Sequence, residues 1–180
     1  VPKTATYRKK LQRNAEACTQ LLKKGIPFPQ PLFVGRDFVI ETHLQGNPIS
    51  DVSLSLAENR AVYFRVGRIL RKLHSIHRKG FGEILPNGNG RYSDWKSVLR
   101  KGIRSTLRVF SKEKFLSQED FERMKTILQD LSYNGAGCLL HGDIKPVHLF
   151  VHRKKLSGIV DASDFLVGDP MYEFGEIQLQ

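Results

Sequence analysis

Apolar residues recur every three or four positions in several stretches of the chain, which is the spacing of an amphipathic helix. The first stretch covers residues 5–24 and is followed by Gly25, a typical helix stop. A longer stretch runs from Leu56 to His77. Two further helices are predicted to begin at Ser93 and Ser117, because serine is a favoured N-cap residue. The pattern therefore predicts four helices in the first three quarters of the chain.

Strands are predicted where short apolar runs are separated by turn residues. The segment PLFVGRDFVIETHL, residues 31–44, indicates two strands joined at Gly35 and Arg36. Three more runs follow late in the chain, CLLH, HLFVH and LSGIV, and the last two are expected to form a hairpin around Lys154. The proline of PMYEFGEIQL then favours the start of a final helix. A helix and a small sheet thus precede a largely helical body, which indicates an α+β fold.

Composition and charge narrow the class of protein. The chain has 180 residues, 40% of them hydrophobic, and lacks an apolar run long enough to span a bilayer. We expect a cytoplasmic protein without a membrane partner. Its 29 Lys and Arg against 18 Asp and Glu give a net charge of +11. The basic residues are scattered beside apolar helical positions and no nucleic-acid motif accompanies them, so we expect no nucleic-acid partner and keep RNA or DNA binding as a distant alternative.

Polar groups interrupt the apolar runs at LLHGDIKPVHLFV, residues 139–151, and again at Asp161. The first interruption contains Asp143, Lys145 and His148. Phosphate transfer from ATP needs a carboxylate to orient the attacking hydroxyl, a cation to offset phosphate charge and side chains to hold a metal ion. The predicted hairpin would bring these four residues together. A lone aspartate in a loop is more often a turn former. The spacing of Asp143 relative to the other three residues favours a catalytic role instead.

These residues carry a resemblance to a known family. HGDIKPVH resembles the catalytic loop H-x-D-x-K-P-x-N of the protein-kinase-like superfamily, with the glycine typical of aminoglycoside phosphotransferase and choline kinase-like small-molecule kinases. IVDASDFLVGDPMYEF is similar to that group's I-D-x-x-x-x-x-x-G-D-P-x-x-D pattern. The resemblance implies a bilobal kinase-like fold. Residues 1–46 would be the remainder of an N-terminal nucleotide-binding lobe with its hinge, and residues 47–180 a mainly helical C-terminal lobe with a catalytic hairpin.

The resemblance also implies site residues and cofactors. Asp143 would be the catalytic base, Lys145 would lie near the transferring phosphate and Asp161 would be the principal Mg²⁺ ligand. His148 stands where the family has asparagine and would be the second metal ligand. His141 is expected to hold the loop by hydrogen bonds. ATP and Mg²⁺ are the implied cofactors.

The nucleotide-binding part of the resemblance is looser. Glu41, Thr42 and His43 match the hinge, whose backbone meets the adenine, and Glu16 is the helical acid expected to pair with the ATP-binding lysine. That lysine and the glycine-rich phosphate loop are expected before Val1. The segment PNGNGR does not qualify, because it lies mid-chain.

The expected activity is transfer of the γ-phosphate of ATP to a hydroxyl of a small molecule, such as an antibiotic, a sugar or an amino alcohol. A protein kinase is disfavoured, because only six residues separate Asp161 from Gly168 and leave no room for an activation segment. The alternative is a catalytically degenerate kinase-fold module that binds a nucleotide or a partner.

Overall fold

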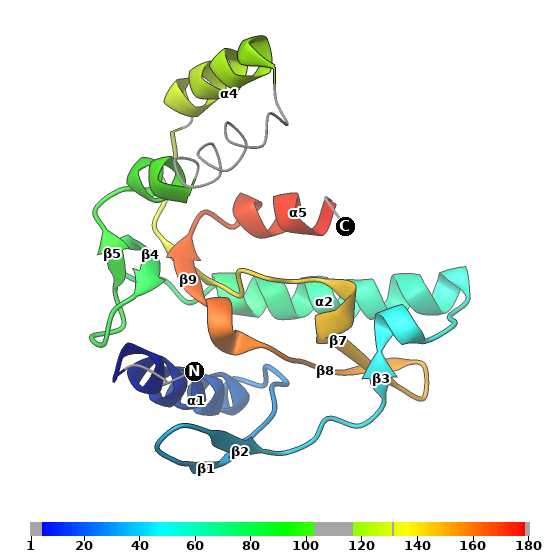
Figure 1. Cartoon of the computed structure of the whole chain (residues 1–180). Helices are drawn as coiled ribbons and strands as arrows, with labels where there is room; N and C mark the ends of the chain where they lie inside the picture. The colour runs from blue at the N-terminus through cyan, green and yellow to red at the C-terminus, as the bar shows by residue number, and fades with distance from the viewer. Residues whose placement is uncertain (1–4, 103–116, 131, 179–180) are drawn as a thin grey trace.

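The computed structural model describes residues 5–102, 117–130 and 132–178, and its elements follow one another as in Figure 1. Helices and strands alternate along the chain, and the strands form three small sheets. The helices are α1 (Ala5–Lys23), α2 (Leu56–His74), α4 (Gln118–Asp130) and α5 (Met171–Gln178), and residues 95–102 are also helical. The strands are β1 (Pro31–Val34), β2 (Val39–Glu41), β3 (Asn47–Pro48), β4 (Phe81–Ile84), β5 (Gly90–Tyr92), β6 (Cys138–Leu140), β7 (Leu149–His152), β8 (Lys155–Ile159) and β9 (Leu166–Gly168). The predicted α+β class is confirmed.

Helix α1 forms where the sequence predicts it. Its apolar stripe buries Ala15, Cys18 and Leu21, and the helix ends before Gly25, whose φ of +69° suits glycine. The chain then turns inward at Ile26, which is completely buried. The predicted stop is therefore confirmed.

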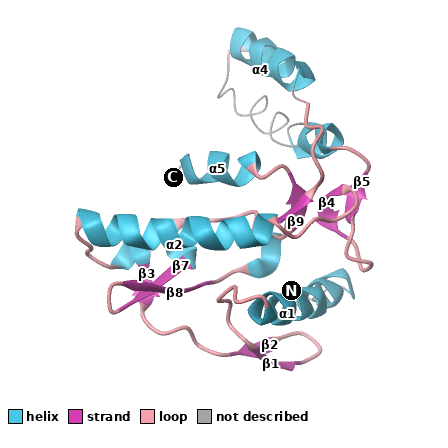
Figure 2. Ribbon diagram, turned by 180° about the vertical axis from the view of Figure 1, so that it is seen from behind, coloured by secondary structure: helices cyan, strands magenta, loops and turns pink. Residues whose placement is uncertain are grey.

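Helix α2 crosses the middle of the molecule in both views (Figures 1 and 2). It begins with a capping box, in which Ser55 accepts a hydrogen bond from the backbone of Glu58 and the Glu58 side chain accepts one from Ser55. Four apolar side chains on one face are buried: Val62, Val66, Leu70 and Leu73. The helix ends at His74, one turn before the predicted end at His77.

The sheets combine expected and unexpected pairs. β1 pairs with β2, and β7 pairs with β8, both antiparallel as predicted. The four-stranded sheet, in the order β5-β4-β9-β6, was not predicted. Its strands are three or four residues long, and β9 pairs with β4 and β6, which lie far from it in sequence. Strands this short show too little alternation of apolar and polar residues to be predicted from the local sequence.

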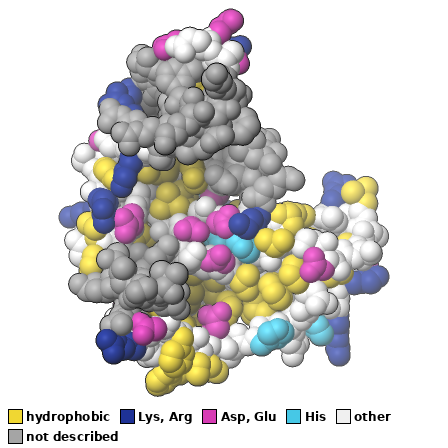
Figure 3. All heavy atoms as spheres, viewed as in Figure 1, with side chains coloured by type: hydrophobic (Ala, Val, Ile, Leu, Met, Phe, Trp, Pro, Cys, Tyr) yellow, Lys and Arg dark blue, Asp and Glu magenta, His cyan; other side chains and the backbone are white. Residues whose placement is uncertain are grey.

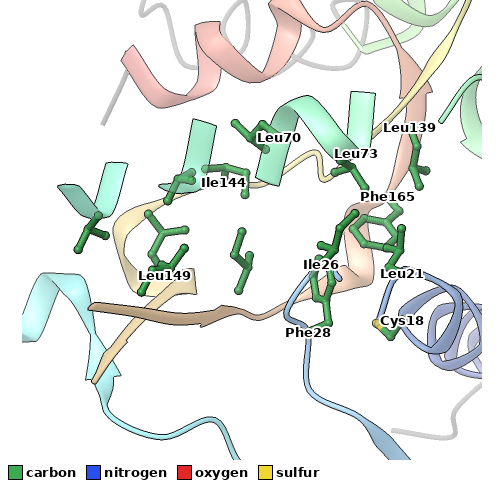
Figure 4. Packing of buried hydrophobic residues seen from close by; sticks show 14 of the residues in the cluster. Cys18, Leu21, Ile26, Phe28, Leu70, Leu73, Leu139, Ile144, Leu149 and Phe165 are labelled. Atoms are coloured by element: carbon green, nitrogen blue, oxygen red, sulfur yellow. The ribbon is translucent and has the colours of Figure 1, made fainter. Parts of the chain in front are cut away.

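One hydrophobic core joins the two ends of the chain. Phe28, from the segment after α1, belongs to the same buried cluster as Leu70 of α2 and as Leu139 and Leu149, which flank the loop between β6 and β7 (Figure 4). Ile144, inside that loop, is only 1% exposed. The polar residues of the loop are therefore fixed between buried apolar anchors.

One predicted helix start is wrong by a residue. The helix expected after Ser93 begins at Trp95, and Asp94 rather than Ser93 caps it. The Asp94 carboxylate accepts a hydrogen bond of 2.8 Å from the backbone N–H of Ser97. A carboxylate is also favoured by the positive end of the helix dipole. The part of this predicted helix after residue 102 lies outside the described residues. Ser117 caps α4 as expected, because its hydroxyl accepts from the N–H of Asp120.

Candidate active site

The β7–β8 hairpin brings the two polar stretches of the sequence together. In its register Leu149 pairs with Ile159, so that the residues just before β7 lie beside those just after β8. The N–H of Val160 donates to the carbonyl of His148 over 3.0 Å and extends this pairing. Asp161 therefore lies next to the loop that carries Asp143, as the hairpin prediction required.

Four side chains meet at this point. Lys145 Nζ lies 2.6 Å from Asp143 Oδ2, and His148 Nε2 lies 3.7 Å from Asp161 Oδ2. One ligand atom from each of Asp143, His148 and Asp161 falls within 4.8 Å of the other two. Figure 3 shows acidic side chains and a histidine gathered near the middle of one face. The structure thus brings all four predicted residues of the two stretches together.

The orientation of His148 is set by its first ring nitrogen. Nδ1 lies 2.8 Å from the backbone carbonyl of Asp143. A carbonyl oxygen only accepts, so Nδ1 carries the proton and the lone pair of the neutral ring is on Nε2. This lone pair is on the side of Asp161. The side chain is 12% exposed, so the ring has little freedom to turn.

These donors fit a divalent cation. Two carboxylates from Asp143 and Asp161 supply the oxygen ligands that Mg²⁺ prefers, and His148 adds a nitrogen. Histidines that bind metals usually donate their other N–H to a carbonyl or carboxylate, as His148 does.

Asp161 has an unusual backbone for an aspartate. Its φ is +66°, in the left-handed region, and its carboxylate accepts a hydrogen bond of 3.1 Å from the N–H of Ser163. Partial burial by itself raises the pKa of Asp161, but hydrogen bonding from Ser163 and the nearby imidazoles of His148 and His141 outweigh it and lower the pKa. The carboxylate is therefore ionised at neutral pH and faces the cluster.

His141 holds the loop from inside. It is completely buried, its Nε2 lies 3.0 Å from the carbonyl of Val160, and its Nδ1 accepts from the N–H of Asp143 over 3.4 Å. Phe28 stacks on the ring at 5.9 Å between centroids. Burial lowers the pKa of His141, so the ring is neutral and both nitrogens have partners. The contacts agree with the loop-holding role that the sequence suggested.

Sequence reasoning missed the second residue that holds this loop. Glu173 of α5 is completely buried, and its Oε1 accepts from the backbone N–H groups of His141 over 2.6 Å and Gly142 over 3.0 Å. Its Oε2 lies 2.5 Å from Nε2 of His74 on α2. The carboxyl group therefore joins two helices to the backbone beside Asp143. The available signal was the last acidic position of the G-D-P-x-x-D pattern, which Glu173 occupies.

A cavity of about 180 Å³ opens beside Asp161, between α1, the β1–β2 hairpin and the segment after β8. Glu41 lines it, and partial burial together with the charge of Asp161 raises the pKa of Glu41. Thr42 bonds to Gln30 through both its N–H and its hydroxyl oxygen, and His43 is exposed. Of the three predicted hinge residues, only Glu41 lines this cavity.

The structure does not bring Glu16 to Asp161. Glu16 lines a different cavity, together with Lys24 and Arg78. The α1 residue that faces the Asp161 cavity is Asn14. Helical spacing in the sequence could have identified Asn14. It follows Leu11 by three residues and therefore shares the inward face of the helix.

A third cavity, of about 370 Å³, is lined by the β6–β7 loop and by the segment after Asp161. Its lining includes Gly142, Asp164, Phe165 and Tyr172. Ser163 lines both this cavity and the one beside Asp161, so the two hollows are neighbours.

Comparison with known proteins identifies the family. The phosphotransferase enzyme family, APH, matches residues 1–178. The chain belongs to this family. Among curated proteins no sequence matches it.

Solved structures of aminoglycoside phosphotransferases share the fold of this family member. A thermostable mutant of APH(4)-Ia, in a ternary complex with ADP and hygromycin B, superposes with a TM-score of 0.70 at 18% identity and covers 93% of the chain. ADP-bound APH(2'')-Ib gives 0.65 at 23% identity over 97% of the chain. The streptomycin–ATP complex of APH(2'')-IIa gives 0.66 at 23% identity over 97%. The matched regions are 60%, 61% and 61% of those chains, so this chain spans about three fifths of their length. The predicted kinase-like fold is confirmed.

Among the described residues, no helix combines the length and the apolar character needed to cross a membrane.

Proposed function

We propose that this phosphotransferase family member transfers the γ-phosphate of ATP to a hydroxyl group of a small molecule. The observation that carries the proposal is the meeting of Asp143, His148 and Asp161 within 4.8 Å, at the point where the β7–β8 hairpin joins the catalytic loop. Family membership and the nucleotides bound by the structural neighbours support it.

Asp143 is the proposed catalytic base. It orients the substrate hydroxyl and takes up its proton as the new bond forms between the hydroxyl oxygen and the γ-phosphorus. The bond from that phosphorus to the bridging oxygen breaks, and ADP leaves. Lys145, whose Nζ lies 2.6 Å from Asp143 Oδ2, forms an ion pair with this carboxylate and places a positive charge beside the transferring group.

Asp161 and His148 are the proposed ligands of Mg²⁺, which when bound offsets the charge of the phosphates. The lowered pKa of Asp161 keeps its carboxylate available for this role. The cavity that Glu41 lines is the proposed nucleotide side, because Asp161 opens onto it. The cavity that Gly142 lines is the proposed acceptor side, because Gly142 directly precedes the proposed base Asp143.

The acceptor is proposed as a hydroxyl-bearing small molecule, such as an antibiotic, a sugar or an amino alcohol. The neighbouring structures hold hygromycin B and streptomycin. The two carboxylates and the lysine of the site define phosphate chemistry and do not discriminate among such acceptors.

Calorimetric titration of Mg·ATP tests the nucleotide half of the proposal. Asp161→Asn removes the charge but keeps a residue that tolerates positive φ and caps the following turn. We expect magnesium-dependent binding to the wild type and at least tenfold weaker binding to this variant. Glu119→Gln, on exposed α4, is the matched control and keeps wild-type affinity. Absence of binding to the wild type would favour the degenerate module instead, and binding indifferent to Asp161 would show that the metal site lies elsewhere.

Phosphate transfer to a panel of hydroxyl compounds, followed with γ-labelled ATP, tests the catalytic half. Asp143→Asn should lower the transfer rate by about 10²- to 10⁴-fold, while Mg·ATP affinity changes little. A variant as fast as the wild type would remove Asp143 from the mechanism.

A further inference from the structure

We infer that His148 is a nitrogen ligand fixed in advance of cation binding, and that it makes this site favour Mn²⁺ over Mg²⁺. The inference rests on the proposed function, since it concerns the cation of the same site. It goes beyond that function by naming which divalent ion the chain selects and which atom selects it.

The first ground is that the imidazole is held in one orientation and one tautomer. Its Nδ1 proton is committed to the carbonyl of Asp143 at 2.8 Å. The backbone on both sides of the ring is also fixed, because the N–H of His148 donates to Lys145 and its carbonyl accepts from Val160. Nε2 is left as the lone-pair donor. No reorganisation is needed before this atom binds a cation, which favours affinity.

The second ground is the position of that lone pair. Nε2 and Asp161 Oδ2 are 3.7 Å apart, a separation that two ligand bonds of about 2.1 Å each can span. His148 is 12% exposed and Asp161 is 40% exposed, so the nitrogen is sheltered while the carboxylate faces the cavity side. The cation would therefore be held between a buried nitrogen and an accessible oxygen.

The third ground is the chemistry of mixed ligands. Mg²⁺ is small and hard, and it takes oxygen ligands in near-ideal octahedral geometry. Imidazole nitrogen suits first-row transition ions better. Zn²⁺ favours sites with several nitrogen or sulfur ligands, whereas this cluster offers one nitrogen and two carboxylates. Mn²⁺ takes the same carboxylate ligands as Mg²⁺ and, as a first-row transition ion, binds imidazole nitrogen better, so of these two ions it fits this donor set better.

Pulsed EPR of Mn²⁺ provides a direct readout that does not depend on activity. The protein is loaded with Mn²⁺ and a non-hydrolysable ATP analogue, and the spectrum is examined for coupling to a directly bound ¹⁴N. We expect this coupling in the wild type and its loss in His148→Asn, which keeps a polar side chain of the family type. His152→Asn, at the far end of β7, is the matched control and should retain the coupling.

Competition between the two ions gives the second readout. The ratio of Mg²⁺ to Mn²⁺ dissociation constants, measured with the same analogue, should fall at least fivefold from the wild type to His148→Asn. Using the ratio of each protein cancels the intrinsic preference of the nucleotide and any general weakening of the variant.

The outcomes separate this inference from the proposed function. If Mn²⁺ binds with the nucleotide but the wild type shows no ¹⁴N coupling, or His148→Asn keeps it, the inference is wrong and the proposed function stands. An unchanged ion ratio would also overturn it, and His148 would then only bridge the two carboxylates. If neither ion binds with the nucleotide, the proposed function and the inference fail together.

Discussion

At the scale of single residues, the buried imidazole of His141 orders the loop by hydrogen bonds and should make it sensitive to acid. His141 is neutral in the fold, with one nitrogen donating and the other accepting. Protonation would remove the acceptor that Asp143 N–H uses and would place a charge in a fully buried position. The histidine that orders the catalytic loop is therefore also a point at which acid weakens the fold.

This reasoning predicts a pH-dependent stability. Burial lowers the pKa of His141, so in the range just below 6.5 the unfolded chain binds a proton that the folded chain does not. The free energy of unfolding should then fall as the pH is lowered through this range. Urea unfolding at pH 7.5 and 5.5 measures the loss, which should be smaller in His141→Gln. The exposed His77→Gln is the control, and an equal loss in wild type and His141→Gln would contradict the prediction.

The two histidines of the loop, His141 and His148, show which features of the candidate site could be predicted from the sequence. The family resemblance placed both His141 and His148, because the motif is local and the hairpin fixes its flanks. It did not reveal the Nδ1 bond of His148 to the carbonyl of Asp143, since that contact depends on how the loop curls between its buried anchors. The sequence therefore predicted His148 as a candidate ligand, but it did not predict that Nε2 is the ring nitrogen left to bind a cation.

At the scale of elements, helix α5 supports the catalytic loop through a single side chain. Glu173 receives two loop N–H groups and meets His74 of α2. Because Glu173 is 32 residues from His141 and 31 from Gly142, no local pattern links the bonded groups. The same limit applies to β9, whose pairing with β4 and β6 escaped prediction. Local periodicity found the long helices and the hairpin, and it could not find contacts made between distant segments.

Removing this support should loosen the loop. Glu173→Ala leaves two sheltered N–H groups without their acceptor, so we expect the free energy of unfolding to fall by about 2–4 kcal/mol. Glu173→Gln keeps one oxygen as acceptor and should lose less. Urea unfolding measures both, and amide hydrogen exchange at Gly142 should accelerate in the alanine variant. The exposed Glu119→Ala on α4 is the control, and an alanine variant at 173 that loses no more than this control would refute the role.

At the scale of the whole molecule, the net charge of the chain is positive, whereas the candidate site contains two acidic side chains. The chain carries a net charge of +11, yet its candidate site is built from two carboxylates, a lysine and a histidine. An excess of positive charge raises the local concentration of anions such as ATP, and the local acids would then place the cation on its phosphates. Under the proposed function, the net charge would favour the approach of a nucleotide, whereas the motif residues would carry out the transfer.

A close contact between Pro27 and Gly158 of β8 crosses the predicted boundary between residues 46 and 47. A Cβ on Gly158 of β8 would lie 2.7 Å from the carbonyl oxygen of Pro27, which also accepts a hydrogen bond from Ile159. Since a bonded backbone oxygen cannot easily move, Gly158→Ala should destabilise the protein by about 1–3 kcal/mol in urea unfolding. Gly67→Ala is the matched control, because no atom lies within 4 Å of the added carbon in the middle of α2. There alanine should stabilise by about 0.5–1 kcal/mol through helix propensity. If both substitutions stabilise, the segment after α1 does not hold β8 in place.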